Sequence, residues 1–147
     1  MDIGCGTGAF TAALQHEGWK VEGIDAAQAM VSQARSKNLN CSKGDILNGL
    51  DHPDASFDLV TAAYVAHGLR QDDRLALFRE ARRLSASTVL FHDYTDDTRF
   101  LTSIVERLEG GDYFNFIRTV QEELRSVFRN LEVIRVGKQA AWYICSK

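Results

Sequence analysis

A glycine-rich turn lies between the first apolar residues of the chain and its first amphipathic stretch. Residues 2–9 read Asp-Ile-Gly-Cys-Gly-Thr-Gly-Ala, and Phe10, Ala13 and Leu14 follow at helical spacing. Glycine permits positive φ and removes the side chain that would keep a ligand away from the backbone. Such a turn can bring the amide groups at a helix N-terminus against a nucleotide-like ligand. The turn therefore predicts a strand, loop and helix of an α/β fold with a ligand site at the loop.

The rest of the chain alternates short β-rich runs with amphipathic stretches, which predicts a parallel sheet covered by helices on both faces. The clearest helix is expected over residues 72–84, where apolar residues follow helical spacing and charges fill the other side. Two β-rich runs separated by Gly137-Lys138-Gln139 predict an antiparallel hairpin. The expected strands are residues 1–3, 20–25, 40–43, 57–62, 88–93, 131–136 and 140–145.

The length of 147 residues predicts a single domain, and 45% hydrophobic with 25% charged residues lies in the ordinary globular range. Beyond residue 93 the rhythm changes. Residues 95–128 are expected to form mainly two helices split by Gly110-Gly111, with aromatic residues that suit a lid or a substrate-side insertion.

The formal net charge of -3 comes from interspersed acids and bases. The densest basic cluster, Arg79, Arg82 and Arg83, shares its segment with acids, so no nucleic-acid partner is expected. Three isolated cysteines without a CxxC pair argue against a zinc site and indicate reduced thiols in the cytoplasm. No apolar run approaches the ~20 residues that cross a bilayer, so no membrane association is expected.

Two further acids follow expected strands. Asp25 ends the run 20–25, and Asp45 follows the run 40–43 in the sequence Gly44-Asp45-Ile46. Open α/β sheets bind ligands beyond the carboxyl ends of their strands, and a carboxylate there can accept hydrogen bonds from both ribose hydroxyls. The order of glycine loop and acids predicts a nucleoside site without naming the nucleoside, since Gly4, Gly6 and Ala9 also satisfy the GxGxxG/A pattern of NAD-binding domains.

Residues 2–8 resemble motif I of class I S-adenosylmethionine (AdoMet)-dependent methyltransferases, an acidic residue followed by GxGxG. Asp2 favours this family, because dinucleotide-binding strands usually have an apolar residue there. Gly44-Asp45-Ile46 and Phe57-Asp58-Leu59-Val60 resemble later family segments, so the similarity covers nearly the whole chain. It implies a Rossmann-like sheet of seven strands in the order 3-2-1-4-5-7-6, with only strand 7 antiparallel.

The resemblance also implies a cofactor site. Asp25 would bind the AdoMet ribose, Asp45 would accept a hydrogen bond from the adenine amino group, and Ala62 and Ala63 would lie beside the transferable methyl group. Ala26 and Met30 correspond to the segment that follows Asp25 near the cofactor. The complete expected set is Asp2, Gly4, Cys5, Gly6, Asp25, Ala26, Met30, Asp45, Ile46 and Ala62, with no metal.

The expected reaction is methyl transfer from AdoMet to an oxygen, nitrogen, sulfur or carbon nucleophile of a small molecule. Because the leaving group is already charged, aligning the reactants and excluding water can provide most of the acceleration. Tyr64, His67 and His92 are candidates to position or deprotonate the acceptor, with hydrogen-bonded loop residues as the alternative interpretation. Two other functions stay open: an NAD-binding oxidoreductase, and a noncatalytic module that binds AdoMet or S-adenosylhomocysteine (AdoHcy) and acts through a partner.

The start of the chain departs from the family pattern. Family members have a helix and several strand residues before the acidic glycine motif, whereas this chain starts at Met1-Asp2-Ile3. We therefore expect a truncated first strand with exposed ladder groups and a reduced cofactor pocket. A fragment, a misassigned start and a homodimer that supplies the missing edge are the alternatives.

Overall fold

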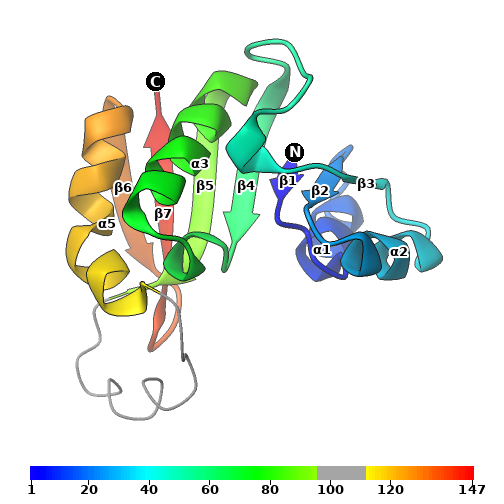
Figure 1. The fold of residues 1–147 in the computed structure, drawn as a ribbon, viewed down its shortest axis with the longest axis horizontal. Coiled ribbons are helices and arrows are strands. Elements are labelled where there is room, and N and C mark those ends of the chain that lie inside the picture. Colours follow the sequence, from blue (N-terminus) through cyan, green and yellow to red (C-terminus); the bar gives the residue numbers. More distant parts are fainter. Residues whose placement is uncertain (96–111) are drawn as a thin grey trace.

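The computed structural model describes residues 1–95 and 112–147, and these form one α/β unit (Figure 1). The described strands make a seven-stranded sheet in the order β3-β2-β1-β4-β5-β7-β6. Strand β7 is antiparallel to β5 and β6, and the other pairs are parallel, so the predicted topology is confirmed. The strands are β1 Asp2–Ile3, β2 Gly23–Asp25, β3 Cys41–Lys43, β4 Phe57–Ala63, β5 Ser85–Tyr94, β6 Asn130–Arg135 and β7 Ala140–Ser146.

Helices cover the sheet in two groups. Figure 1 shows α3 and α5 side by side over the part of the sheet that contains β5, β7 and β6, whereas α1 and α2 lie beside β1, β2 and β3. The helices are α1 Ala9–His16, α2 Gln28–Ser36, α3 Gln71–Leu84 and α5 Tyr113–Val127, with short 3-10 turns η1 Ile46–Asn48 and η2 Ala66–Gly68. None of the helices in the described ranges is long and apolar enough to cross a lipid bilayer.

The two helix groups pack on opposite faces of the sheet. Successive residues of a strand point to opposite faces. Val60 and Ala62 of β4 belong to the same buried cluster as Leu77 of α3. Thr61 between them bonds to Asp2, which in turn bonds to Thr11 of α1. The helices on both faces that the sequence predicts are therefore present.

The central strand β1 is short, as is its neighbour β2. Its two residues pair with Gly23 and Ile24 on one side and with Thr61 and Ala62 on the other. Residues 20–22, predicted as the start of a strand, lie outside β2, whose first residue Gly23 pairs with Asp2, the first residue of β1. The strand predicted over residues 20–25 was therefore too long. The short first strand that we expected is present as β1.

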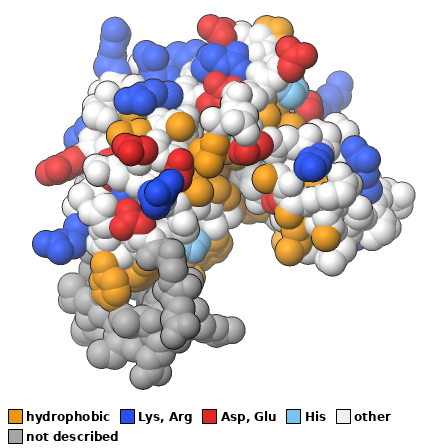
Figure 2. Space-filling model, viewed as in Figure 1, with side chains coloured by type: hydrophobic (Ala, Val, Ile, Leu, Met, Phe, Trp, Pro, Cys, Tyr) orange, Lys and Arg blue, Asp and Glu red, His pale blue; other side chains and the backbone are white. Residues whose placement is uncertain are grey.

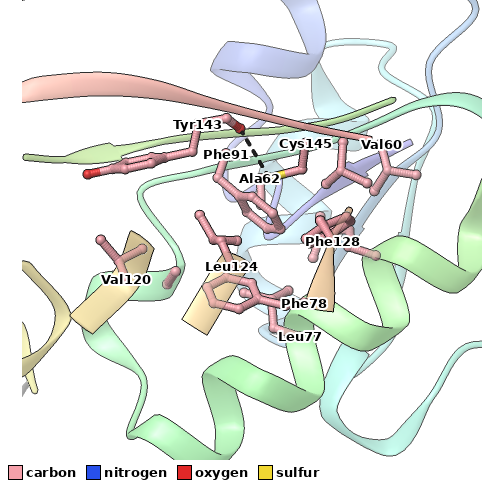
Figure 3. Packing of buried hydrophobic residues seen from close by; sticks show 14 of the residues in the cluster. Val60, Ala62, Leu77, Phe78, Phe91, Val120, Leu124, Phe128, Tyr143 and Cys145 are labelled. Carbon is pink, nitrogen blue, oxygen red and sulfur yellow. Dashed lines mark hydrogen bonds between the residues drawn. The ribbon is translucent and has the colours of Figure 1, made fainter. Parts of the chain in front are cut away.

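The main core lies between the sheet and the pair α3 and α5. Figure 3 shows aromatic rings of this core, Phe78, Phe91 and Phe128, gathered with aliphatic side chains from both helices. Phe78 and Phe91 meet edge-on with ring centroids 4.8 Å apart. Each buried side chain of this size contributes roughly 1.5–3 kcal/mol, so this packing holds the ends of β4 and β5 in fixed positions.

Helix α3 confirms the helix predicted over residues 72–84, but one of its charges is in the core. The sequence pattern assigns its charges to the solvent side, and Arg79 and Arg82 are indeed exposed. Arg74 is wholly buried, where it bonds to both carboxylate oxygens of Glu123 in α5 at 2.8 Å. It also donates to Asp112 at 2.9 Å. A buried arginine needs such partners, and they lie too far along the chain for helical periodicity to reveal.

The insertion predicted over residues 95–128 falls partly on described residues. Its second expected helix is α5, which begins at Tyr113 just after Gly110-Gly111. The first expected helix, and the role of the segment as a lid, lie outside the described residues.

Candidate functional site

The glycine loop joins β1 to α1 with three residues in left-handed backbone conformations, Gly4 (φ 66°), Gly6 (φ 54°) and Gly8 (φ 84°). A Cβ at Gly4 would clash with Val65, which follows β4. A Cβ at Gly6 would meet no atom within 4 Å, so the backbone there borders open space. The loop therefore needs glycine for its shape and leaves room for a ligand at Gly6.

Asp25 at the end of β2 is held by two backbone amides. Gly6 donates to its Oδ2 and Ala27 to its Oδ1, both at 2.8 Å. Each carboxylate oxygen has a further lone pair, so Asp25 can still accept hydrogen bonds from ligand hydroxyls. The bond from Gly6 places this carboxylate beside the glycine loop, as the sequence predicts.

Two cavities meet at this edge of the sheet. The first, which we term the Asp25 cavity, has a volume of ≈ 340 Å³ and includes Asp25, Ala26, Asp45 and Ile46 in its lining. The second, the glycine-loop cavity, has a volume of ≈ 450 Å³. Its lining includes Asp2, Gly4, Cys5, Gly6, Phe10, Ala63, Tyr64 and His92.

Gly4 and Tyr64 line both cavities, so an elongated ligand could occupy the two together. In Figure 2, hydrophobic side chains gather in the hollow between the part of the molecule with α3 and α5 and the part with α1 and α2.

Asp2 has a side chain whose hydrogen bonds stay within the protein. Its residue is 1% exposed. Thr11 donates to its Oδ2 at 2.6 Å, and Thr61 donates to its Oδ1 at 3.1 Å. Burial raises the pKa of this carboxyl, although the two threonine hydroxyls oppose the shift. Asp2 thus joins β1, β4 and α1 beneath the glycine loop, and it borders the cavity only at its floor.

Asp45 follows β3 and caps the turn η1. Leu47 donates its backbone N–H to Oδ1 at 3.0 Å, and Asn48 donates its side-chain amide to Oδ2 at 2.7 Å. Ile46 and Leu47 provide an apolar wall beside the carboxylate. The Asp25 cavity therefore has one carboxylate at the end of β2, another after β3, and an apolar wall. This combination suits a nucleoside.

Three other residues of the expected cofactor set lie in surroundings that differ from those of Asp25 and Asp45. Cys5 lines the glycine-loop cavity but is largely buried against Cys41, and burial raises the pKa of its thiol to about 12. Ala62 is buried in the main core, whereas its neighbour Ala63 lines the glycine-loop cavity. Met30 lies exposed on α2. Of the expected set, Ala62 and Met30 are the two that the lining of these cavities does not include.

Tyr64 stands at the junction of the cavities with strained backbone. Its φ is 55°, a left-handed conformation that costs a non-glycine residue energy and is common at functional sites. Its backbone N–H donates to the backbone carbonyl oxygen of His92 at 2.8 Å. Its ring meets the His92 ring edge-on, with centroids 4.8 Å apart. Burial raises the pKa of the Tyr64 hydroxyl, so it stays protonated at neutral pH.

His67 is paired with a buried carboxylate. Its Nδ1 lies 2.9 Å from Oδ1 of Asp93, which is 1% exposed. The other Asp93 oxygen accepts the backbone N–H groups of Ala66 and His67. A carboxylate is an acceptor, so His67 Nδ1 carries the proton of this bond. The arrangement fixes the turn η2 against β5 and orients the imidazole among aromatic rings.

His92 has a different kind of partner. Trp142 lies directly opposite it across the β5–β7 pair and donates its indole N–H to His92 Nδ1 at 2.8 Å. Burial lowers the pKa of His92, and the nearby Asp93 opposes this only in part. His92 also lines a third cavity, the hairpin cavity, with a volume of ≈ 610 Å³. Its lining consists of Tyr64, His92, Tyr94, Val136, Gly137, Lys138, Gln139 and Ala140.

Sequence reasoning did not single out Thr11, Thr61 or Trp142. Thr11 pairs with a residue nine positions away, but the others lie 59 and 50 positions from their partners. Only the strand register brings these pairs together. The period-2 pattern of β4, combined with the parallel pairing of β1, is the one signal that could have indicated Thr61.

A methyltransferase domain family model matches residues 1–88, which include the glycine loop, Asp25 and Asp45. The chain belongs to the class I AdoMet-dependent methyltransferase family. Membership of this family excludes the NAD-binding oxidoreductase that glycine spacing alone left open. The matched residues run through β4, so they contain the whole lining of the Asp25 cavity.

Two curated methyltransferases are similar in sequence. The cypemycin N-terminal methyltransferase of a Streptomyces species is 32% identical over 119 residues, covering 76% of this chain and 45% of that protein. Trans-aconitate 2-methyltransferase of Escherichia coli is 39% identical over 66 residues, covering 42% of this chain and 25% of that enzyme. The chain therefore aligns with less than half the length of these relatives.

Solved methyltransferase structures share the fold over almost the whole chain. An AdoMet-dependent methyltransferase from Archaeoglobus fulgidus superposes with a TM-score of 0.77 at 16% identity, covering 99% of this chain and 84% of that one. Magnesium protoporphyrin IX methyltransferase from Synechocystis, solved with bound AdoHcy, gives 0.74 at 18% identity, with 99% and 72% covered.

Proposed function

We propose that this protein transfers a methyl group from AdoMet to a nucleophile on a small-molecule acceptor. The observation that carries the proposal is the joining of the Asp25 and glycine-loop cavities at Gly4 and Tyr64. One cavity suits a nucleoside, and the other extends from it along bare backbone toward Tyr64 and His92. A ligand with a nucleoside at one end and an amino-acid chain at the other matches both.

The residues that would hold AdoMet come from three neighbouring strands. Asp25 would accept the ribose hydroxyls with the lone pairs that Gly6 and Ala27 leave unused. Ile46 would flank the adenine beside Asp45. Gly6 lets the ligand approach the backbone closely, and Gly4 lets the loop pack against Val65. Asp2 links β1 at the start of this loop to α1 and β4, so it would affect cofactor binding only by positioning the loop.

The chain needs no metal or nucleophile of its own for this reaction. AdoMet supplies a methyl group on a positively charged sulfur, which is already an activated leaving group. Tyr64 and His92 line both the glycine-loop cavity and the hairpin cavity, and they would position the acceptor. His67 is oriented by Asp93 and is absent from the linings of the three cavities, so we assign it no contact with the acceptor.

The chemical class of the methyl acceptor is the more specific part of the proposal. The curated relatives are named for methylating the N-terminus of cypemycin and trans-aconitate, so this sequence similarity extends over unlike acceptors. A small molecule is favoured by the size of the cavities around Tyr64, which lie in the range of about 300–1,000 Å³ typical of small-ligand sites. The homodimer that we expected from the short first strand stays a prediction.

Isothermal titration of the purified 147-residue protein with AdoMet, AdoHcy and NADH tests this function. We expect AdoMet and AdoHcy to bind and NADH not to bind. Asp25→Ala should weaken AdoHcy binding at least tenfold, because it removes both the ribose acceptor and the partner of the Gly6 amide. Asp58→Ala, at an exposed position in β4, is the matched control and should bind like the parent.

Binding of NADH in place of AdoHcy would contradict the proposal, as would equal affinities in the parent and Asp25→Ala. Tight AdoHcy binding without turnover of any acceptor would instead favour the noncatalytic binding module.

A further inference from the structure

The hairpin cavity adjoins the cofactor site without belonging to it. It shares Tyr64 and His92 with the glycine-loop cavity, and its other walls are Tyr94 and the turn between β6 and β7. A molecule in the hairpin cavity would therefore lie beside the part of the cofactor site that Tyr64 and His92 line. An acceptor there would adjoin the cofactor, as transfer of the methyl group requires.

The lining of this cavity favours an anion. Lys138 brings a positive charge with three N–H donors, and Gln139 brings an amide. The rings of Tyr64, His92 and Tyr94 add weakly polar walls. Among its described lining residues there is no Asp or Glu, so an ammonium group would find no partner of opposite charge. Coulomb attraction therefore selects anionic over cationic ligands here.

The bond from Trp142 determines which proton His92 carries. An indole N–H is only a donor, so His92 Nδ1 must accept and be without a proton. A neutral imidazole then has its proton on Nε2 and acts there as a donor. Protonation of Nδ1 would set two N–H groups against each other. Burial lowers the pKa of His92 and so independently favours the neutral ring. His92 is thus a hydrogen-bond donor and not a base.

We propose that the hairpin cavity holds the methyl acceptor, and that the acceptor is a small carboxylate bound by the Nε2–H of His92 and the ammonium of Lys138. The inference rests on the proposed methyltransferase function. A carboxylate is ionised at neutral pH and has no proton to lose, so a site whose neighbouring histidine is a donor suits it. Tyr64 lines both the glycine-loop cavity and the hairpin cavity, so its ring would border both ligands.

The reaction balances without a base. A lone pair on a carboxylate oxygen forms a bond to the methyl carbon while the bond from that carbon to sulfur breaks. The bonding pair stays on sulfur, so the sulfonium becomes the neutral thioether of AdoHcy. The carboxylate becomes a neutral methyl ester, and no proton moves.

Titration of the AdoHcy-saturated protein with succinate, citrate and benzoate, and with succinamide and benzamide, tests the acceptor site. We expect at least one carboxylate to bind and neither amide to bind. Lys138→Gln and His92→Phe should each weaken carboxylate binding about tenfold or more. AdoHcy binding by Lys138→Gln should stay within about twofold, because Lys138 lines the hairpin cavity and neither of the two cofactor cavities. Lys43→Gln and His16→Phe, at exposed positions outside the cavities, are the matched controls.

The outcomes separate this inference from the proposed function. If AdoHcy binds but no carboxylate does, or if inorganic phosphate or the peptide amide Ala-Ala-NH2 binds as well as the carboxylates, the carboxylate site is wrong and the methyltransferase function stands. If AdoHcy fails to bind, the function is wrong. The same titration of the cofactor-free protein then decides the site alone, because binding that depends on Lys138 supports it and no binding overturns it.

Nitrogen NMR of histidine gives a second readout that needs no ligand. We expect His92 to be the Nε2–H tautomer at pH 7, and Trp142→Phe to allow the other tautomer and raise the pKa of His92. A His92 that carries its proton on Nδ1 in the parent protein would overturn the assignment of the donor.

Discussion

Asp2 has the same residue type as the acid of the family motif, but its surroundings give it a structural task. Thr11 and Thr61 occupy one lone pair on each of its oxygens within a site closed to solvent. Asp25 carries its two amide bonds at the edge of a cavity. The sequence predicts both acids for the cofactor site, but only the strand register tells which one lies beneath the loop.

Removing the Asp2 side chain should destabilise the fold. Asp2→Ala leaves the two threonine hydroxyls without their acceptor, so we expect the free energy of unfolding to fall by about 1–3 kcal/mol. Asp2→Asn keeps an oxygen in place and should cost less. Urea unfolding at pH 7 measures both, and equal stability of Asp2→Ala and the parent would contradict this role.

The pH dependence of these variants has a definite sign. Because burial raises the folded-state pKa of Asp2 above its unfolded value, the folded protein binds more protons there. Its contribution to stability is therefore complete below the unfolded pKa and is lost as pH rises through the folded pKa. Unfolding measured from pH 4 to pH 7 should show Asp2→Asn gaining stability relative to the parent as pH rises.

Helices α3 and α5 are joined by a buried ion pair as well as by apolar packing. Arg74 and Glu123 form two hydrogen bonds at 2.8 Å, and burial and Arg74 act on Glu123 in opposite directions, with a net lowering of its pKa. Asp112, which precedes α5, bonds to the same guanidinium. The bonds of Arg74 to Asp112 and Glu123 therefore fix the position of α5 beside η2, the turn that carries His67.

Removing one partner of this ion pair should destabilise the fold more than removing both partners. Arg74→Met leaves Glu123 charged and buried, so we expect a loss of roughly 3–5 kcal/mol in unfolding free energy. The double variant Arg74→Met with Glu123→Leu removes both charges and should recover much of that loss. A double-mutant cycle by urea unfolding measures the coupling, and additive effects of the two changes would contradict the account.

Much of the architecture could be predicted because it follows from local patterns. The glycine loop, the helix at residues 72–84 and the hairpin turn each have a signal within a few residues, and the family resemblance supplies their order in the sheet. The contacts of Arg74, His67 and His92 join residues 26–50 positions apart, and no periodicity encodes them. The sequence therefore predicted residues that line cavities at this edge of the sheet, but not how their side chains are oriented.

The whole molecule places its ligand-facing residues at one edge of the sheet, beyond the carboxyl ends of the parallel strands. β2 contributes Asp25, the segment after β3 contributes Asp45, and the segment after β4 contributes Tyr64. The antiparallel strand β7 and its turn add the hairpin cavity at the far side of Tyr64. Cavities that share Tyr64 thus run from Asp25 to the turn between β6 and β7.

A crystal structure of the protein with AdoHcy tests this arrangement most directly. We predict that both ribose hydroxyls lie within hydrogen-bond distance of the Asp25 carboxylate, with adenine against Ile46 beside Asp45 and the sulfur directed toward Tyr64. AdoHcy bound with its ribose away from Asp25, or bound in the hairpin cavity, would contradict the account.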